Sequence, residues 1–332
     1  YGCIKSAMLW YELFAGTLKD LGFVLNPYDP CVANAMINGK QCTIAWYVDD
    51  LKVSHMEKRV VMDMLKAIET KFGGLKITTG RNHTYLGMDI TFKKNGTLEI
   101  RMKDYIKEAI EASGEDVSKG VSTPATRHLF DIDEKSERLS HTKSDLYHHI
   151  VAKLLYVSKR SRLDIQLTIG FLCTRVSCST IEDWAKLKQM IQYLNRTLYD
   201  FLTLGADNMT TMDTWVDASY AVHADMKSHT GGAISLGRGA AMSKSSKQKL
   251  NTKSSTEAEV VGASDYVPNS IWAAHFLEHQ GYVLKRNIFH QDTQSAMKME
   301  RNGRRSCGQK SRHIDVRYFF IKDRVDSGEI DI

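Results

Sequence analysis

The sequence has little of what defines several special classes of protein. With four prolines and 22 glycines among 332 residues, it is neither collagen-like nor of low complexity. Its longest apolar stretches, such as Leu167–Cys173, are far shorter than the roughly 20 residues of a membrane-spanning helix. It shows no signal peptide, and because it begins with Tyr1 rather than Met, we expect it to be a piece of a longer protein.

The six cysteines do not form a recognisable framework. None belongs to a Cys-x-x-Cys pair, and no histidine lies beside them at zinc-finger spacing, which argues against a zinc site. A disulfide scaffold is also unexpected in a chain of this length. The pattern favours an intracellular protein with reduced thiols.

The composition is that of a globular protein, with 42% hydrophobic and 25% charged residues. A length of 332 residues suggests two domains, or three, each with a core of its own. There are 45 Lys and Arg against 39 Asp and Glu, so the net charge is +6. This mild excess permits nucleic acid as a partner without requiring it.

A pair of adjacent aspartates is predicted at the tip of a hairpin. The segment Thr43–Val48 is rich in strand-forming residues, Asp49 and Asp50 follow, and a second strand begins at Leu51. Two carboxylates at such a tip can bind Mg²⁺, which prefers oxygen ligands. The alternative is that aspartate simply favours turns, and for an isolated pair the turn is the more common reason.

The middle of the chain reads as strands followed by helices. A hairpin is predicted from Tyr85–Ile90 and Leu98–Ile100, joined through Asn95 and Gly96, with a helix over 104–112 behind it. A polar connector over 113–145 leads into helices over 146–200. Ser179 and Glu182 fit a capping box at the start of one of these helices.

Three further carboxylates are predicted at the ends of elements after residue 206. Asp217 ends a strand, Glu259 lies early in a long helix that we expect Pro268 to bend, and Asp292 follows a later strand. Strands alternating with helices indicate an α/β sheet, in which such positions can meet at one edge and bind metal ions. The alternative is that each is a helix-capping or surface carboxylate, and spacing alone favours it.

Basic residues flank these carboxylates on both sides. Because phosphate backbones attract such charges, we interpret the clusters as a nucleic-acid-binding surface, although a solvated charge run is the alternative. The residues are Lys244, Lys247, Lys249 and Lys253, and then Arg301, Arg304, Arg305, Lys310, Arg312 and Arg317. We assign no catalytic role to the single histidines His223, His290 and His313.

Short motifs in collinear order resemble the Pol polyprotein of Ty1/copia-type retrotransposons, over essentially the whole chain. Tyr47–Asp50 resembles the catalytic hairpin of reverse transcriptases. The other matching segments are Tyr1–Tyr11, Asp29–Val32, Tyr85–Ile90, Ser122–Pro124, Leu154–Tyr156 with Arg162–Ile165, Gln192–Leu194 with Thr197, Ser254–Glu259, Asp292–Ala296 and His313–Asp315.

The resemblance implies a fold and a domain order. The fold would be mixed α+β and α/β. It would comprise a partial reverse-transcriptase palm and thumb over 1–125, a helical connection over 126–205, and an RNase H-like mixed sheet with flanking helices over 206–332. This last domain would be truncated at its carboxyl end.

The resemblance also assigns roles to the carboxylates. Asp49 and Asp50 would belong to the polymerase metal site, and Asp217, Glu259 and Asp292 to the RNase H metal site, each with two Mg²⁺ ions. The implied partners are RNA–DNA hybrid, template–primer and dNTPs, and the implied location is a cytoplasmic particle or the nucleus. We expect no membrane association.

The chain departs from the family pattern at several positions. Lys5 replaces the usual Gln, Leu163 the usual Pro and Thr293 the usual Asn. The first polymerase aspartate of the family would precede Tyr1, so we expect no polymerase activity from this chain alone. The fourth RNase H carboxylate would lie beyond Ile332, with Asp315 as a possible substitute. The rival hypotheses are a non-enzymatic or decayed remnant that at most binds nucleic acid, and a stand-alone RNase H-like nuclease.

Overall fold

The computed structural model describes residues 4–302 and 315–332, which form two compact units. One unit holds the chain up to Gly80 together with Trp272–Leu284, and the other holds Arg81–Ile271 and Lys285–Ile332. These units do not coincide with the domain boundaries implied by the family resemblance, which remain predictions. Within the described residues, no helix is both long and apolar enough to span a membrane.

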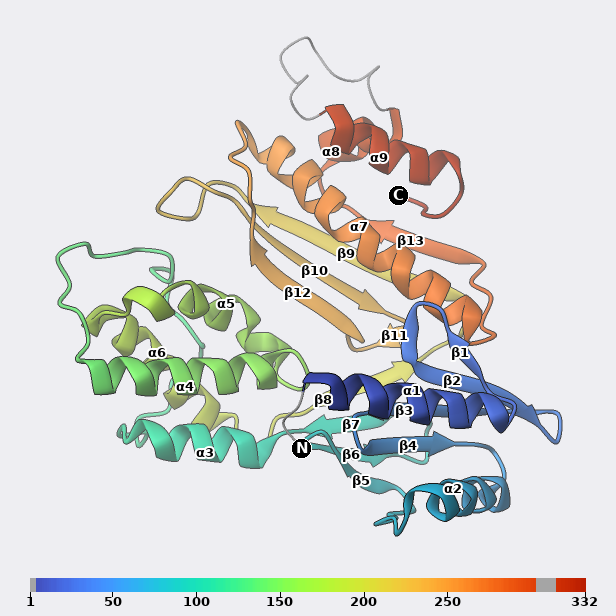
Figure 1. Ribbon diagram of the computed structural model, residues 1–332. Coiled ribbons are helices and arrows are strands. Elements are labelled where there is room, and N and C mark those ends of the chain that lie inside the picture. Colours follow the sequence, from blue (N-terminus) through green and yellow to red (C-terminus); the bar gives the residue numbers. More distant parts are fainter. Residues whose placement is uncertain (1–3, 303–314) are drawn as a thin grey trace. The chain divides into compact units, whose positions relative to one another are not determined.

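The first unit is a four-stranded antiparallel sheet with helices (Figure 1). Its sheet order is β1-β2-β3-β4. The elements are α1 (Ile4–Asp20), β1 (Val24–Asn26), β2 (Asp29–Ile37), β3 (Lys40–Tyr47), β4 (Asp50–Ser54) and α2 (Lys58–Phe72).

The core of this unit lies between the sheet and its helices. Ile44 and Trp46 of β3 point to the same side because side chains alternate along a strand, and both are buried with Phe14 of α1 and Ile68 of α2. The unit also includes the end of a helix that begins in the second unit. There the Trp272 indole donates a hydrogen bond of 3.0 Å to the Tyr28 carbonyl oxygen.

The predicted aspartate hairpin is confirmed. Tyr47 pairs with Asp50, so Val48 and Asp49 form the turn, and Val48 has a left-handed backbone with a φ of 54°. The Trp10 indole of α1 donates a hydrogen bond of 2.7 Å to the Val48 carbonyl oxygen. Both aspartates are exposed at the tip.

In the second unit, a five-stranded antiparallel sheet adjoins a group of helices. Its order is β11-β8-β7-β6-β5. The strands are β5 (Asn82–Tyr85), β6 (Met88–Phe92), β7 (Leu98–Arg101), β8 (Leu202–Ala206) and β11 (Gly237–Arg238). The helices are α3 (Lys103–Ser113), α4 (His141–Ser158), α5 (Gln166–Thr174) and α6 (Ile181–Arg196), with 3₁₀ turns at Leu163–Ile165 and Val176–Cys178.

Two local predictions in this region were wrong. Tyr85–Ile90 is not one strand, because Leu86 and Gly87 have φ values of 50° and 71° and turn the chain between β5 and β6. The capping box of α6 is formed by Thr180 and Asp183, one residue later than predicted from Ser179 and Glu182. The apolar side chains of α6 are buried, with Trp184, Leu187 and Leu194 in the core.

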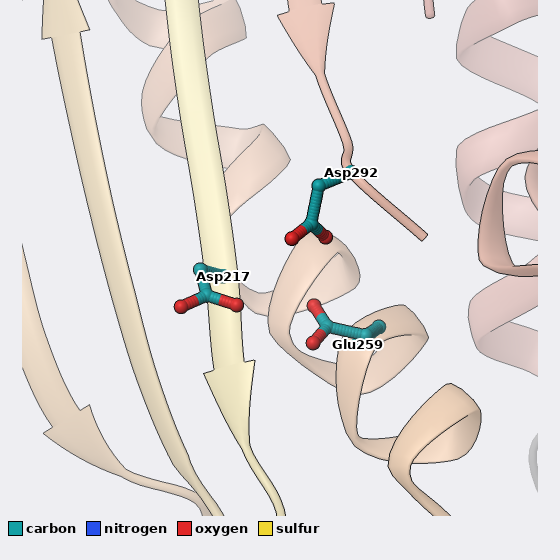
Figure 2. A group of neighbouring side chains, drawn as sticks. All are labelled: Asp217, Glu259 and Asp292. Atoms are coloured by element: carbon teal, nitrogen blue, oxygen red, sulfur yellow. The ribbon is translucent and has the colours of Figure 1, made fainter. Parts of the chain in front are cut away.

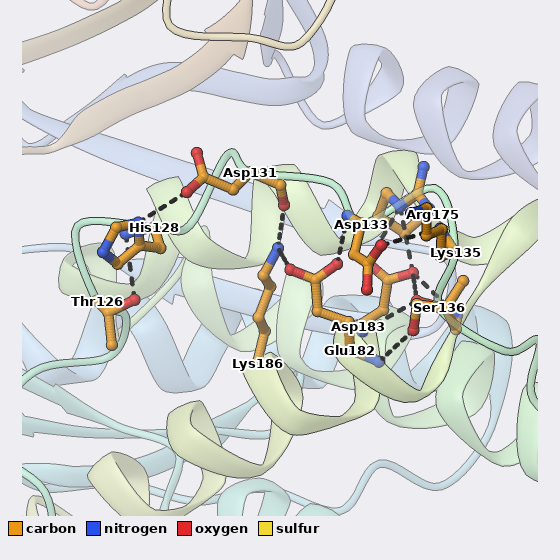
Figure 3. A network of polar contacts seen from close by, with 11 residues as sticks. Thr126, His128, Asp131, Asp133, Lys135, Ser136, Arg175, Glu182, Asp183 and Lys186 are labelled. Atoms are coloured by element: carbon orange, nitrogen blue, oxygen red, sulfur yellow. Dashed lines mark hydrogen bonds and ion pairs between the residues drawn. The ribbon is translucent and has the colours of Figure 1, made fainter.

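The polar connector before α4 is tied to the start of α6 (Figure 3). The Asp133 backbone amide donates a hydrogen bond of 2.8 Å to the Glu182 carboxylate, and the Ser136 hydroxyl accepts one of 3.2 Å from the Glu182 amide. The Lys186 ammonium lies 3.0 Å from the same carboxylate. The connector is therefore held in place by α6 despite its acidic, loop-like composition.

The second sheet of this unit is mixed, with the order β12-β10-β9-β13. Strand β13 runs parallel to β9, and the other pairs are antiparallel. The strands are β9 (Thr211–Ser219), β10 (His229–Ser235), β12 (Met242–Lys247) and β13 (Arg286–His290), and the helices are α7 (Ser255–His279), α8 (Gln294–Asn302) and α9 (Asp315–Asp326). Near the carboxyl end, Asp331 forms an isolated parallel bridge with Ile288 of β13.

Helix α7 covers one face of this sheet (Figure 1). Thr214 and Val216 of β9 are buried, and the Thr214 hydroxyl lies 3.0 Å from the Ser270 hydroxyl of α7. The alternate residues Trp215 and Asp217 are exposed on the other face. The helix continues through Pro268 to His279 as a single element.

Candidate metal centre

Three carboxylates that lie far apart in the sequence converge in the second unit. Asp217 lies on β9, Glu259 in the second turn of α7, and Asp292 two residues after the end of β13 (Figure 2). One oxygen from each lies within 4.8 Å of the others. Asp217 was predicted at the end of its strand, but β9 continues for two more residues to Ser219.

The three carboxylates have different environments. Asp217 and Asp292 are exposed, whereas Glu259 is buried. Burial, and next the Asp217 carboxylate, raise the pKa of Glu259 to about 7, although a hydrogen bond from the Ala218 backbone amide opposes this shift. Such crowding of negative charge is relieved when a cation binds between the carboxylates.

The donor set fits a hard divalent cation. All three groups offer carboxylate oxygens, which Mg²⁺ prefers, and the two exposed groups leave room for water and substrate oxygens. Oxygen Oε2 of Glu259 is buried without a hydrogen-bond partner in the described part of the chain. Asp217, Glu259 and Asp292 are thus the residues that could hold the metal ion.

An open groove of about 820 Å³ adjoins the exposed carboxylates. Trp215 and His290 line it, with stacked rings whose centroids lie 4.9 Å apart, and His290 contacts Asp213 at 2.7 Å. Gly231 of β10 lies opposite Asp217 in the sheet register and also lines the groove. The sequence did not indicate this stacked pair, because His290 and Trp215 are 75 positions apart.

The predicted basic residues differ in their exposure and in whether they form an ion pair. Lys244 is exposed and lines the groove, and Lys249 and Lys253 are exposed in the segment before α7. Lys247 forms an ion pair of 2.7 Å with Asp225. Four predicted residues, Arg304, Arg305, Lys310 and Arg312, lie outside the described residues, as does His313.

Within the described residues, no further acidic side chain joins the predicted pair Asp49 and Asp50 or the predicted triad Asp217, Glu259 and Asp292. Among residues 4–302 and 315–332, only Asp217, Glu259 and Asp292 form a group of three metal-ligating side chains, so Asp49 and Asp50 stand as a pair. Asp315 begins α9. Its side chain is outside the described atoms.

The relatives found by comparison with known proteins are transposon proteins. A Retrovirus-related Pol polyprotein from transposon TNT 1-94 of Nicotiana tabacum is 26% identical over 339 residues, covering 100% of this chain and 25% of that protein. A putative transposon Ty5-1 protein of Saccharomyces cerevisiae is 28% identical, covering 80% of this chain and 86% of that protein. No family model matches.

Among solved structures, the foamy viral protease–reverse transcriptase in complex with an RNA/DNA hybrid is similar in fold. The TM-score is 0.55 at 12% sequence identity, covering 99% of this chain and 38% of that chain. The fold is therefore similar to that of part of this foamy viral protein. The chain is a distant homologue of the reverse transcriptase and RNase H region of Ty1/copia-type retrotransposon Pol polyproteins, and it spans about a quarter of the tobacco polyprotein.

Proposed function

We propose that this chain is a reverse transcriptase–RNase H fragment whose Asp217, Glu259 and Asp292 support metal-dependent hydrolysis of RNA in RNA–DNA hybrids. The observation that carries the proposal is the convergence of these three carboxylates from β9, α7 and the end of β13. The homology to Pol polyproteins supports it, because it covers the full chain.

In this proposal, bound Mg²⁺ ions supply the activation of water and the stabilisation of the leaving 3′ oxygen. The protein supplies the arrangement of ligands. Glu259 is held at the sheet by the Ala218 backbone amide and is shielded from water, while Asp217 and Asp292 face solvent beside the groove. The hybrid would be recognised by its backbone shape and 2′-hydroxyls rather than by sequence.

The proposed partners follow from the same assignment. RNA–DNA hybrid and template–primer are the nucleic-acid partners, and the exposed lysines beside the groove are proposed to contact phosphates. In the intact polyprotein, Asp49 and Asp50 would bind Mg²⁺ for RNA-directed DNA synthesis from dNTPs. The location would be intracellular, in a cytoplasmic particle or the nucleus.

The polymerase assignment applies to the intact polyprotein only. In the described residues, Asp49 and Asp50 have no third carboxylate beside them, whereas polymerase chemistry of this class needs metal ions that clamp both reacting oxygens. Processive primer extension by the purified chain would contradict this restriction.

The hydrolytic proposal is tested by cleavage of an end-labelled RNA–DNA hybrid with Mg²⁺. We expect D217N and E259Q each to lower the rate roughly 10³-fold, equivalent to about 4 kcal/mol of lost stabilisation. The matched control is E278Q, which removes an exposed carboxylate from the same helix as Glu259. Equal cleavage by all variants would refute the site, and tight binding without cleavage by the wild type would favour the non-enzymatic remnant.

A further inference from the structure

Three buried side chains beside the metal centre carry polar atoms that have no hydrogen-bond partner among the residues that the structure describes. They are Glu259, through Oε2, Gln291, through Nε2, and Glu300, through both carboxylate oxygens. Glu300 is fully buried, although it lies on the short helix α8 whose sequence is mostly polar. A buried carboxylate without partners costs folding free energy, so such a group in a native structure needs a specific reason.

These residues come from adjacent elements. Gln291 lies between the end of β13 and Asp292, and Glu300 is on the helix that follows directly. The start of α8 is tied to the start of α7, because the Ser295 and Thr256 hydroxyls lie 3.1 Å apart. The start of α8 therefore lies at the end of α7 that carries Glu259.

The Gln291 amide influences both carboxyl groups and therefore lies near each of them. Burial raises the pKa of Glu300 to about 7, and the Glu259 carboxylate adds to this shift, so the two acids are close. The Gln291 amide lowers the pKa of Glu259 and of Glu300. In the present geometry neither contact is a complete hydrogen bond, since Nε2 remains unpartnered.

The unpartnered atoms are complementary to one another. A side-chain amide nitrogen carries two N–H donors, and each carboxylate accepts hydrogen bonds. If one N–H of Gln291 is donated to Glu259 and the other to Glu300, the unpartnered atoms of Glu259 and Gln291 and one oxygen of Glu300 are satisfied together. The same bonds would fix the orientation of the Glu259 carboxylate.

We propose that Gln291 and Glu300 are positioning residues that orient Glu259 for binding of a divalent metal ion, through the contacts Glu300–Gln291–Glu259. This inference rests on the proposed function, since it concerns the same metal centre. Groups that orient metal ligands in this way typically change metal affinity by 10- to 100-fold when they are lost. Glu300 does not bind the metal ion itself.

The test is Mg²⁺ binding to the full chain, measured by isothermal titration calorimetry without substrate. We expect Q291L and E300L each to raise the Kd about 10-fold. The double variant Q291L/E300L should bind Mg²⁺ no more weakly than either single variant, because both substitutions break the same chain of contacts. E300Q should stay within about threefold of wild type, because its amide carbonyl can still accept from Gln291.

The control variant is N287L. Asn287 is a buried polar residue of β13, bonded to Ser270 and to the Glu329 carbonyl oxygen, away from the carboxylates. Its replacement is expected to lower stability without changing the Kd for Mg²⁺. If E300L does not fold, as judged by circular dichroism, E300M and Q291L provide the same comparison.

The outcomes separate the two proposals. Absence of Mg²⁺ binding in the wild type would refute the metal centre, and the positioning role with it. Binding in the wild type with an unchanged Kd in Q291L and E300L would refute only the positioning role. Strictly additive effects of Q291L and E300L would also refute it, because they would show that the two residues act independently. An equal change in N287L would refute it as well, because it would indicate general destabilisation.

Discussion

At the scale of single residues, a buried histidine pair shows how strongly burial controls ionisation. The His223 Nε2 and His229 Nδ1 atoms lie 3.0 Å apart, and His229 Nε2 lies 2.8 Å from the Ser245 hydroxyl. Burial, and next the charge of His223, lower the pKa of His229 to about 4. Burial and then Lys247 lower the pKa of His223 as well, while Asp225 opposes this.

Acid should therefore destabilise the fold through His229. Between about pH 6.5 and about pH 4 the unfolded chain binds the proton and the folded chain does not, so the free energy of unfolding falls as the pH falls. The loss from this residue is up to about 3 kcal/mol. Urea unfolding at pH 7 and pH 4.5 measures it, and H229F should flatten the dependence. H141Q, at a highly exposed histidine, should leave it unchanged.

At the scale of secondary-structure elements, β10 and α7 pack closely through a glycine. A Cβ atom on Gly232 would lie 2.5 Å from the Tyr266 ring of α7, whereas one on the neighbouring Gly231 would meet no atom within 4 Å. The two glycines point to opposite faces of the sheet, because side chains alternate along a strand. Packing therefore requires a glycine at position 232 but not at position 231.

Alanine substitutions at these two glycines should differ. G232A should lower the free energy of unfolding by about 1–3 kcal/mol, because the added methyl group overlaps the Tyr266 ring. G231A should stay within about 0.5 kcal/mol of wild type. Urea unfolding of the metal-free chain measures both, and equal effects would contradict the packing argument.

Local patterns predicted the type of an element better than its limits. The aspartate hairpin and α3 follow from strand-forming runs and helical spacing that involve only near neighbours. The turn at Leu86 was missed because an alternating pattern continues across it. The α6 cap was misplaced by one residue because Ser179 and Thr180 are chemically equivalent candidates.

The same limit applies to the candidate site. The sequence pattern was enough to select Asp217, Glu259 and Asp292 as candidate ligands, because each lies near the end of a recognisable strand or the start of a helix. Glu300 was not, since a glutamate in a polar helix predicts an exposed side chain. Its burial depends on how α8 packs against elements distant in sequence.

At the scale of the whole molecule, where the net charge is +6, the basic side chains differ in whether they form ion pairs. Lys244 lines the groove beside the candidate metal centre, and Lys249 and Lys253 are exposed in the segment before α7. None of the three forms an ion pair within the described residues. Lys247 is instead paired with Asp225. Among the described residues, these three lysines are thus exposed positive charges without an ion pair, which a phosphate backbone could contact.

Neutralising these lysines should weaken hybrid binding in a salt-dependent way. The triple variant K244Q/K249Q/K253Q should reduce the slope of log affinity against log salt by about 2–3, or about 1 for each lost phosphate contact. Fluorescence anisotropy with a labelled hybrid measures it. The control K58Q/K66Q/K71Q removes the same charge from α2. An equal reduction in both would show that only net charge matters.

Helix α7 places a limit on how the chain can be dissected. Its first turns carry Glu259, while its last turns belong to the first unit, where Trp272 is bonded to Tyr28 and the Phe276 carbonyl oxygen accepts from Asn26. A recombinant fragment that starts at residue 206 would retain all three carboxylates but lose both partners of this helix end. Genetic exchange of the part that carries the three carboxylates between related retrotransposons would therefore be best tolerated when the β1–β2 segment is exchanged with it.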